Sequence, residues 1–180
     1  MLIGVTTLGE VAARDGALDE GAFLARHPHP VLLHPPLDSQ PGLSGFQTDL
    51  TDARSTLEEI DKHLTTRPSL LVTPVVKKDG NLFPSRICLG RTRNNDLVIL
   101  HPRISKFHAY FTTGEEGAYF ITDAGSTNGT FLDGKRLPTQ RRVPLRDRCI
   151  ISLGRHFHFR FHTPEGFYLV ARALWQQGLH

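Results

Sequence analysis

Three short polar segments of the sequence carry groups that bind anions. Asp123–Phe131 reads Asp-Ala-Gly-Ser-Thr-Asn-Gly-Thr-Phe, a turn-forming run of small hydroxyl and amide residues. Upstream lie Gly90-Arg91 and the segment Ser105–His108, which reads Ser-Lys-Phe-His. Arginine offers a planar fork of donors that matches a phosphate, and hydroxyls add further donors. Because each segment lies at the end of an expected strand, the three together predict a loop-built pocket for a phosphate carried on a protein.

Each segment also has a simpler interpretation. A lone Gly-Arg fits any exposed turn, and Ser126–Thr130 fits an ordinary turn rich in Asn and Gly. Ser105 and His108 have the residue types of a nucleophile and its base. However, no acid is well placed in the sequence to orient the imidazole, and no Gly-x-Ser-x-Gly turn is present. We therefore expect Ser105 to donate its hydroxyl to an anion and His108 to brace the loop from inside.

Short strands are expected to position these loops. From about residue 70 onward, apolar runs alternate with turn signals, a pattern typical of a mainly β fold and here of an antiparallel β-sandwich. Asp79-Gly80 predicts a hairpin between the first two strands. The expected strands are Leu70–Val76, Asn81–Leu89, Leu97–Leu100, Ala109–Thr113, Ala118–Thr122, Thr130–Leu132, Lys135–Leu137, Arg148–Leu153 and His156–His162.

Residues 1–69 predict an N-terminal extension of short helices, loops and one or two short strands. Thr7 and Asp19 are capping residues for two short helices, and Val31–His34 is a short apolar strand. Ser55–Glu58 has capping-box spacing and predicts another helix, with Leu57, Ile60 and Leu64 on one face. No chemistry is indicated in this region.

A helix over residues 163–178 is expected to follow the last strand and to pack on the sandwich. Thr163-Pro164-Glu165 combines a capping hydroxyl, a proline at the first helical position and an acid in the first turn. Phe167, Val170, Ala171 and Leu174 recur at helical spacing. The alternative is a final hairpin through Phe167–Val170.

The net charge of +3 hides a division along the chain. Residues 1–70 hold 5 Lys/Arg and 10 Asp/Glu, a balance of −5, whereas residues 71–180 hold 16 and 8, a balance of +8. The basic part would attract an anionic partner such as a phosphoprotein, nucleic acid or an acidic membrane. We expect the acidic part to pack on the sandwich; the alternative is that it covers the basic pocket.

The remaining composition indicates a globular protein of the cytoplasm. Cys88 and Cys149 lie in apolar runs without metal-type spacing, which favours buried free thiols over a disulfide. The sequence has no apolar run long enough for a transmembrane helix. The first residues also lack the basic start and long apolar stretch of a signal peptide.

The order and spacing of the motifs closely resemble the forkhead-associated (FHA) domain over about residues 71–162. These motifs are Gly90-Arg91, the Asn95-Asp96 turn, Ser-x-x-His at 105–108, and Asp-x-x-Ser-x-Asn-Gly-Thr-Phe from Asp123. The resemblance implies an FHA domain at residues 70–162, a β-sandwich whose loops at one end bind phosphothreonine in partner proteins.

The resemblance also implies a role for each matching residue. The phosphopeptide-binding set consists of Arg91, Ser105 and Thr127 at the phosphate, Lys106 as a second cation, and Asn128 on the peptide backbone. The loop-structuring set consists of Gly90, His108, Ser126 and Gly129. Arg103 either adds a further cation or supports its loop.

The function implied is phosphothreonine-dependent protein recognition in Ser/Thr kinase signalling, without enzymatic activity. The expected partner is a phosphothreonine-containing protein, either a Ser/Thr kinase or its substrate. Neither a membrane partner, a cofactor nor a metal is expected. The alternative is a phospho-independent scaffold or assembly subunit that uses the same fold and binds through the N-terminal region and the C-terminal helix.

Two weaker features complete the survey. His156, His158 and His162 lie close enough for a metal site, but we favour solvated positions on a strand. Arg141, Arg142, Arg146 and Arg148 could contact nucleic acid, but few aromatic residues interleave with them, so stacking on single strands has little support.

Overall fold

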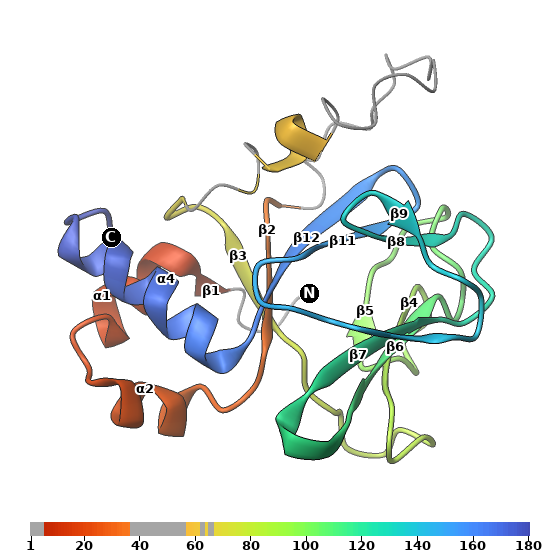
Figure 1. Ribbon diagram of the computed structural model, residues 1–180, viewed down its shortest axis with the longest axis horizontal. Helices are drawn as coiled ribbons and strands as arrows, with labels where there is room; N and C mark the ends of the chain where they lie inside the picture. Colours follow the sequence, from red (N-terminus) through yellow and green to blue (C-terminus); the bar gives the residue numbers. More distant parts are fainter. Residues whose placement is uncertain (1–5, 37–56, 62–63, 65–66) are drawn as a thin grey trace.

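The computed structural model describes residues 6–36, 57–61, 64 and 67–180 (Figure 1). Most of the described chain forms two β-sheets, and three helices lie together at one end of the larger sheet. The helices are α1 (Leu8–Asp15), α2 (Glu20–Arg26) and α4 (Pro164–Gln176), together with a 3₁₀ turn at Glu115–Gly117. Residues 57–61 are also helical.

The larger sheet has seven strands in the order β1-β3-β2-β12-β11-β8-β9, and all its pairings are antiparallel. These strands are β1 (Thr6–Thr7), β2 (Val31–His34), β3 (Leu71–Pro74), β8 (Thr130–Leu132), β9 (Lys135–Arg136), β11 (Ile150–Leu153) and β12 (Phe157–His162).

The smaller sheet has five strands in the order β10-β7-β6-β4-β5. They are β4 (Ile87–Gly90), β5 (Leu97–Val98), β6 (Ala109–Thr113), β7 (Tyr119–Asp123) and β10 (Arg142–Pro144). Its pairings are antiparallel except for β4 with β5, which run parallel. The expected sandwich is therefore confirmed.

The main core lies between the two sheets. Phe157, Phe159 and Phe161 alternate along β12 and all point into this core, as the two-residue period of a strand requires. Ile121 on β7 and Phe111 on β6 face them from the smaller sheet. This apolar layer holds the two sheets together and so fixes the loops at their ends.

Strand β2, from the N-terminal region, is inserted between β3 and β12. Both of its faces are buried. Leu32 belongs to the sandwich core, whereas Val31 and Leu33 belong to a second core under the helices. The strand therefore joins the two cores and is an integral part of the larger sheet.

The second core is formed by α1, α2 and α4 against the β2–β3 side of the larger sheet, at the left of Figure 1. Phe23 on α2 packs edge-on against Phe167 on α4, with ring centroids 5.5 Å apart. The C-terminal helix is confirmed, and the alternative hairpin through Phe167–Val170 is wrong. Side chains of Thr7, Asp19 and Thr163 cap the three helices as expected.

The predicted Asp79-Gly80 hairpin is wrong. Strands β3 and β4 belong to different sheets, and residues 81–86 form a loop rather than a strand. The Asp96 carboxylate instead accepts hydrogen bonds from the backbone N–H groups of Lys78 and Cys88, at 2.8 Å and 2.6 Å. These donors are thus satisfied by a side chain, which removes the need for a cross-strand partner.

One strand of the smaller sheet differs from the expectation, and one part of a predicted helix stays a prediction. Strand β10 was not expected, because Arg142–Pro144 is short, charged and ends in proline. Ser55 and Thr56 of the predicted capping box lie outside the described residues. No helix in the described part of the chain is both long and apolar enough to cross a bilayer.

Candidate functional site

A buried carboxylate shapes the turn between β7 and β8. Asp123 Oδ1 accepts hydrogen bonds from the N–H groups of Gly125 and Ser126, at 2.9 Å and 3.0 Å. Its Oδ2 accepts from the hydroxyls of Ser126 and Thr130, at 2.6 Å and 2.7 Å. Burial by itself raises the pKa of Asp123, but these hydrogen bonds outweigh burial and hold the pKa below its usual value. Both the backbone N–H and the hydroxyl of Ser126 are therefore bonded within the turn.

Gly129 closes the same turn in a left-handed conformation, with φ of 80°. A side chain there would be strained, and its Cβ would also lie 2.8 Å from Arg136 Nε. The Gly129 carbonyl accepts hydrogen bonds from Gly154 N–H at 2.8 Å and from His108 Nε2 at 3.3 Å. The turn is thereby attached to two other loops.

His108 connects this turn to the Ser105 loop from a fully buried position. Its Nδ1 accepts a hydrogen bond from Ser105 N–H at 3.2 Å, so the ring proton is on Nε2, which donates to Gly129. Burial lowers the pKa of His108, which favours the neutral ring that this arrangement needs. The ring thus joins the Ser105 loop to the Gly129 turn.

Arg91, Ser105 and Thr127 come together at the loop end of the sandwich. Arg91 N–H donates to the Ser105 carbonyl at 3.0 Å, and its guanidinium donates to the Pro102 carbonyl at 3.3 Å. Thr127 N–H donates to Ser105 Oγ at 3.1 Å, and the two hydroxyl oxygens are 3.4 Å apart. Thr127 is exposed, and Arg91 and Ser105 are partly exposed. Two hydroxyls thus meet at the surface, on a loop that is hydrogen-bonded to the backbone of Arg91.

Gly90, the last residue of β4, lets this strand and the Lys106 backbone approach each other closely. A Cβ on Gly90 would lie 2.3 Å from the Lys106 carbonyl oxygen, which is too close for any side chain. That oxygen accepts hydrogen bonds from Asn95 Nδ2 at 2.7 Å and from Thr92 Oγ1 at 2.9 Å. The Lys106 side chain itself is exposed. Asn95, a buried amide, was assigned no role from the sequence; its only signal was its place in a turn.

Asn128 lies at the exposed rim, next to Thr127. Its Nδ2 donates to the Arg103 carbonyl at 2.6 Å. The Arg103 guanidinium lies 2.6 Å from His156 Nε2. Burial, Arg103 and His101 lower the pKa of His156, so its ring favours the neutral form that can accept from Arg103. Arg103 therefore supports the Asn128 loop through both its carbonyl and its side chain.

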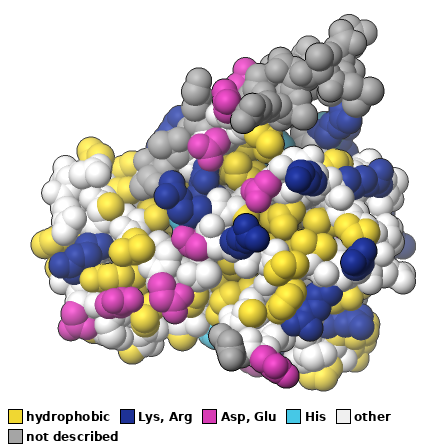
Figure 2. Space-filling view, viewed as in Figure 1, with side chains coloured by type: hydrophobic (Ala, Val, Ile, Leu, Met, Phe, Trp, Pro, Cys, Tyr) yellow, Lys and Arg dark blue, Asp and Glu magenta, His cyan; other side chains and the backbone are white. Residues whose placement is uncertain are grey.

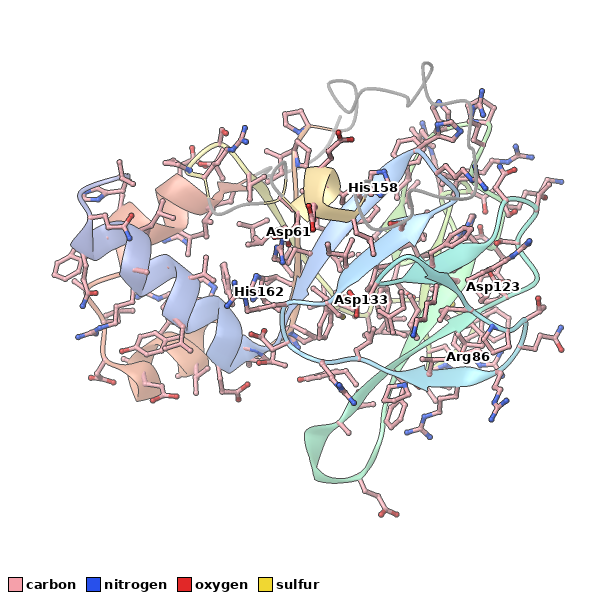
Figure 3. The ribbon with its side chains drawn as sticks, turned by 45° about the horizontal axis from the view of Figure 1, so that its top comes forward. Asp61, Arg86, Asp123, Asp133, His158 and His162 are labelled. Carbon is pink, nitrogen blue, oxygen red and sulfur yellow. The ribbon has the colours of Figure 1, made fainter. Side chains whose placement is uncertain are left out.

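The histidines on β12 have separate partners. His158 Nδ1 lies 2.8 Å from Ser152 Oγ, and His162 Nδ1 lies 3.1 Å from Asp147 Oδ1. In Figure 3, His162 lies toward the helices and Asp123 lies on the opposite side of the sandwich. Among residues 6–36, 57–61, 64 and 67–180, no group of three His, Cys, Asp or Glu side chains is arranged to hold a metal ion.

Charge is unevenly distributed over the face shown in Figure 2. Lys and Arg side chains predominate over the sandwich half, whereas acidic side chains gather at the lower left over the helices. Within the N-terminal third, the Asp15 carboxylate is fully buried, forms ion pairs with Arg14 and Arg26, and lies 2.9 Å from His27 Nε2. An anionic partner is therefore favoured at the sandwich end.

The fold and site define a β-sandwich whose end loops gather donors for an anion. Residues 87–154 match the family model of the FHA domain, so the chain contains an FHA domain. The match covers Arg91, Ser105, Lys106, Thr127 and Asn128 together with the four loop-structuring residues.

Curated relatives share this region of the chain. Smad nuclear-interacting protein 1 of Mus musculus is 37% identical over 83 residues, covering 39% of this chain and 22% of the relative. The E3 ubiquitin-protein ligase DMA2 of Saccharomyces cerevisiae is 30% identical over 115 residues, covering 54% of this chain and 22% of the relative. The chain thus spans about a fifth of the length of these relatives.

Solved structures of FHA domains are similar as well. The N-terminal FHA domain of Rad53p from S. cerevisiae, solved in complex with a phosphothreonine peptide, is 20% identical. The similarity covers 54% of this chain and 88% of that domain, with a TM-score of 0.45.

Proposed function

We propose that this protein binds phosphothreonine in a partner protein and acts as a recognition module in Ser/Thr kinase signalling. One observation carries the proposal: Arg91 is hydrogen-bonded to the Ser105 backbone, and the Ser105 and Thr127 hydroxyls lie 3.4 Å apart beside it. Two hydroxyl residues and an arginine, three donor-bearing residues of two kinds, are thus joined at the partly exposed loops of an FHA domain.

The chemistry of these donors suits a phosphate monoester. A phosphothreonine carries a charge of about −1.5 to −2 and three acceptor oxygens. Arg91 can bind two of these oxygens with its planar fork, and Ser105 and Thr127 can each donate a hydroxyl. Charge-assisted hydrogen bonds contribute about 1.5–3 kcal/mol each, which is sufficient for micromolar binding at an open surface.

Asn128 and Lys106 are proposed to act on either side of the phosphate. Asn128 is exposed at the rim, and its amide can bind peptide backbone in place of the Arg103 carbonyl. Lys106 follows Ser105 directly and has an exposed ammonium group. A backbone contact requires a peptide, so it would convert anion binding into recognition of a phosphorylated protein.

The proposal includes no catalytic step. Ser105 is adjacent to His108, but Nδ1 of that histidine accepts from the Ser105 backbone and Nε2 donates to Gly129. The ring therefore has no nitrogen available to take a proton from the Ser105 hydroxyl. The buried free thiols Cys88 and Cys149 support a cytoplasmic location.

Calorimetric titration tests the proposed function. Matched peptides with phosphothreonine, phosphoserine or unmodified threonine are titrated into the full chain. We expect the phosphothreonine peptide to bind at least tenfold more tightly than the unmodified one, since several charge-assisted bonds are gained. Arg91→Ala removes this preference and Arg91→Lys keeps only part of it. The control Arg141→Ala changes an exposed arginine elsewhere. Equal affinity for modified and unmodified peptides contradicts the proposal.

A phospho-independent scaffold is the second candidate, and the C-terminal helix favours it. Leu169 on α4 is 64% exposed and Trp175 is 37% exposed, although the same helix buries Phe167 and Leu174. Exposed apolar side chains of this size are typical of an interface. A complex that survives Arg91→Ala but is lost in Leu169→Asp would support this candidate.

A further inference from the structure

Three aromatic rings form a ladder beside the candidate phosphate site. Phe107 lies between Phe83 and Tyr110, with centroid distances of 6.1 Å and 5.9 Å and interplanar angles of 11° and 10°. The Arg86 guanidinium lies 4.6 Å from the Tyr110 centroid and 5.8 Å from that of Phe83. Phe83 is 47% exposed and Leu82 is 85% exposed. Apolar side chains that gather at the surface indicate a binding surface.

Two adjoining hollows lie against this ladder, with volumes of about 350 Å³ and 200 Å³. Phe83, Asn94 and Asn95 line both of them, and we call the pair the aromatic groove. The larger hollow is also lined by Lys106, which directly follows Ser105. The aromatic groove therefore shares Lys106 with the proposed phosphopeptide-binding set, and its size suits one or two side chains of a peptide.

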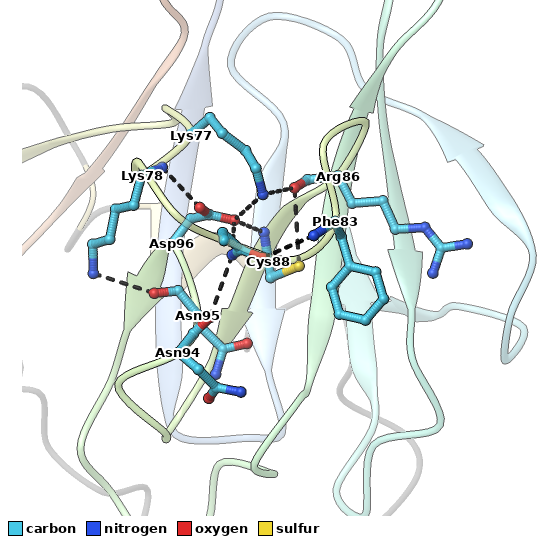
Figure 4. A network of polar contacts seen from close by, with 9 residues as sticks. Lys77, Lys78, Phe83, Arg86, Cys88, Asn94, Asn95 and Asp96 are labelled. Carbon is cyan, nitrogen blue, oxygen red and sulfur yellow. Dashed lines mark hydrogen bonds and ion pairs between the residues drawn. The ribbon is translucent and has the colours of Figure 1, made fainter.

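One wall of the groove is the loop that carries Lys78, Asn81 and Phe83, and a buried carboxylate, Asp96, binds this loop (Figure 4). Asp96 accepts hydrogen bonds from Asn81 Nδ2 at 2.8 Å and from Lys77 Nζ at 3.3 Å, besides the backbone donors of Lys78 and Cys88. These bonds outweigh the effect of burial and keep the pKa of Asp96 below its usual value. The loop that carries Phe83 is thus anchored at both ends, and little ordering would be needed on binding.

The inner wall is tied to the phosphate loop. Asn95 Nδ2 and Thr92 Oγ1 both donate to the Lys106 carbonyl, and Asn95 Nδ2 also lies 3.0 Å from Thr92 Oγ1. Thr92 and Asn95 line the larger hollow. A peptide whose phosphate is held at Arg91 and Ser105 would therefore meet the groove at a fixed distance.

The rim of the groove is basic. Lys78, Arg93 and Lys106 line it, whereas Asp79 is the one acid among its lining residues. An acidic peptide segment is favoured over a basic one by this charge.

We propose that the aromatic groove binds residues flanking the phosphothreonine, with an aromatic or branched apolar side chain against Phe83 and Phe107 and acidic residues at the basic rim. This inference rests on the proposed function and specifies the sequences that the site selects. Burial of the apolar side chain supplies affinity, and the rim cations add a charge preference.

The ladder is less suited to single-stranded nucleic acid. Bases stack on open ring faces. Phe107 contacts both Phe83 and Tyr110, and Arg86 lies over the Tyr110 ring. A base that stacks on that face of Tyr110 would have to displace Arg86, whereas a side chain can enter the hollow beside Phe83 and Phe107.

A phosphothreonine peptide array tests the inference. The phosphothreonine is fixed, and Phe, Leu, Glu, Lys and Ala are placed in turn at each flanking position. We expect Phe or Leu at one position to improve binding of the wild-type chain about tenfold over Ala, and Lys near it to weaken binding.

Two variants test the groove itself. Phe83→Ala should lose the apolar preference, and Arg93→Glu should lose the preference against Lys. Both should still prefer phosphorylated over unmodified peptides, because neither lies at Arg91. Leu179→Ala, at a 50% exposed position beyond the end of α4, is the matched control.

The outcomes separate this inference from the proposed function. Binding of phosphopeptides without any positional preference, or with the same preference in Phe83→Ala, overturns the inference alone. Failure of the wild-type chain to prefer any phosphopeptide overturns both. Binding of oligouridylate that Phe83→Ala abolishes, with no apolar preference on the array, would assign the groove to nucleic acid instead.

Discussion

Ser105 N–H donates to Nδ1 of His108 at 3.2 Å, so the loop that carries the candidate phosphate donor is held by a buried ring. Nε2 of the same ring donates to the Gly129 carbonyl at 3.3 Å. A single side chain therefore sets the separation between the Ser105 loop and the Thr127-Asn128 turn without being exposed itself.

We expect His108→Ala to weaken phosphopeptide binding although His108 cannot touch a peptide. The substitution leaves Ser105 N–H and the Gly129 carbonyl each without this partner, at a cost of about 1–3 kcal/mol of unfolding free energy. Urea denaturation measures stability and calorimetry measures affinity. His29→Ala, an exposed position on the N-terminal side, is the control. Unchanged affinity in a folded His108→Ala protein would contradict the bracing role.

The buried histidines make stability depend on pH. Burial lowers the pKa values of His108 and His34 below the ordinary 6.5. As pH falls below about 6.5, the unfolded chain binds protons that the folded chain does not, so the unfolding free energy falls. The loss continues down to the folded-state pKa of each group. The denaturant concentration at the midpoint of unfolding should decrease as the pH is lowered from about 8 to about 5. The double variant that carries both His34→Gln and His108→Gln should show a smaller decrease. A decrease of the same size in the double variant would contradict this assignment.

Asp123→Asn should destabilise the protein and lower phosphopeptide affinity together. The carboxylate accepts four hydrogen bonds in the β7–β8 turn, and a buried charge-assisted bond is worth about 1.5–3 kcal/mol. The pKa of Asp123 is lowered in the folded state, so its contribution is present above the unfolded value of 3.8 and disappears as pH falls through the folded value. The stability difference between wild type and variant should therefore shrink in acid. A constant difference would indicate a purely steric effect.

Gly90→Ala should be strongly destabilising because its Cβ would meet the Lys106 carbonyl oxygen at 2.3 Å. Relief of this contact requires β4 to move away from the Ser105–Lys106 backbone, which costs about 1–3 kcal/mol. In contrast, Gly21→Ala in helix α2 places its Cβ no closer than 3.5 Å to another atom, and alanine is the better helix residue by about 0.5–1 kcal/mol. Thermal melts of the two variants should shift in opposite directions.

The sequence predicted the sandwich because its strand signals are local. Ala109–Thr113 was predicted with its observed bounds, and the Asp-x-x-Ser motif identified the turn after β7. Pairing between distant segments carries no such signal. Asp79-Gly80 has hairpin composition, yet the Asp96 side chain satisfies the neighbouring backbone donors and β3 pairs with β2 instead. The aromatic groove was missed for the same reason, since Phe83 and Phe107 meet only after β4 and β6 have paired.

Strand β2 should be necessary for the FHA domain to fold, although it lies well before residues 87–154 that match the family model. Leu32 is 1% exposed in the sandwich core, and Leu33 is 1% exposed in the core under the helices. Leu32→Ala and Leu33→Ala should each cost about 2–5 kcal/mol of unfolding free energy. Leu169→Ala, at a 64% exposed position, should change it by less than about 0.5 kcal/mol.

A fragment of residues 70–162 would expose the edges of β3 and β12 that β2 now pairs, so we expect it to aggregate. Denaturation measures the unfolding free energy of the variants, and size-exclusion chromatography shows whether the fragment aggregates. A stable monomeric fragment would show that β3 and β12 can pair directly when β2 is absent.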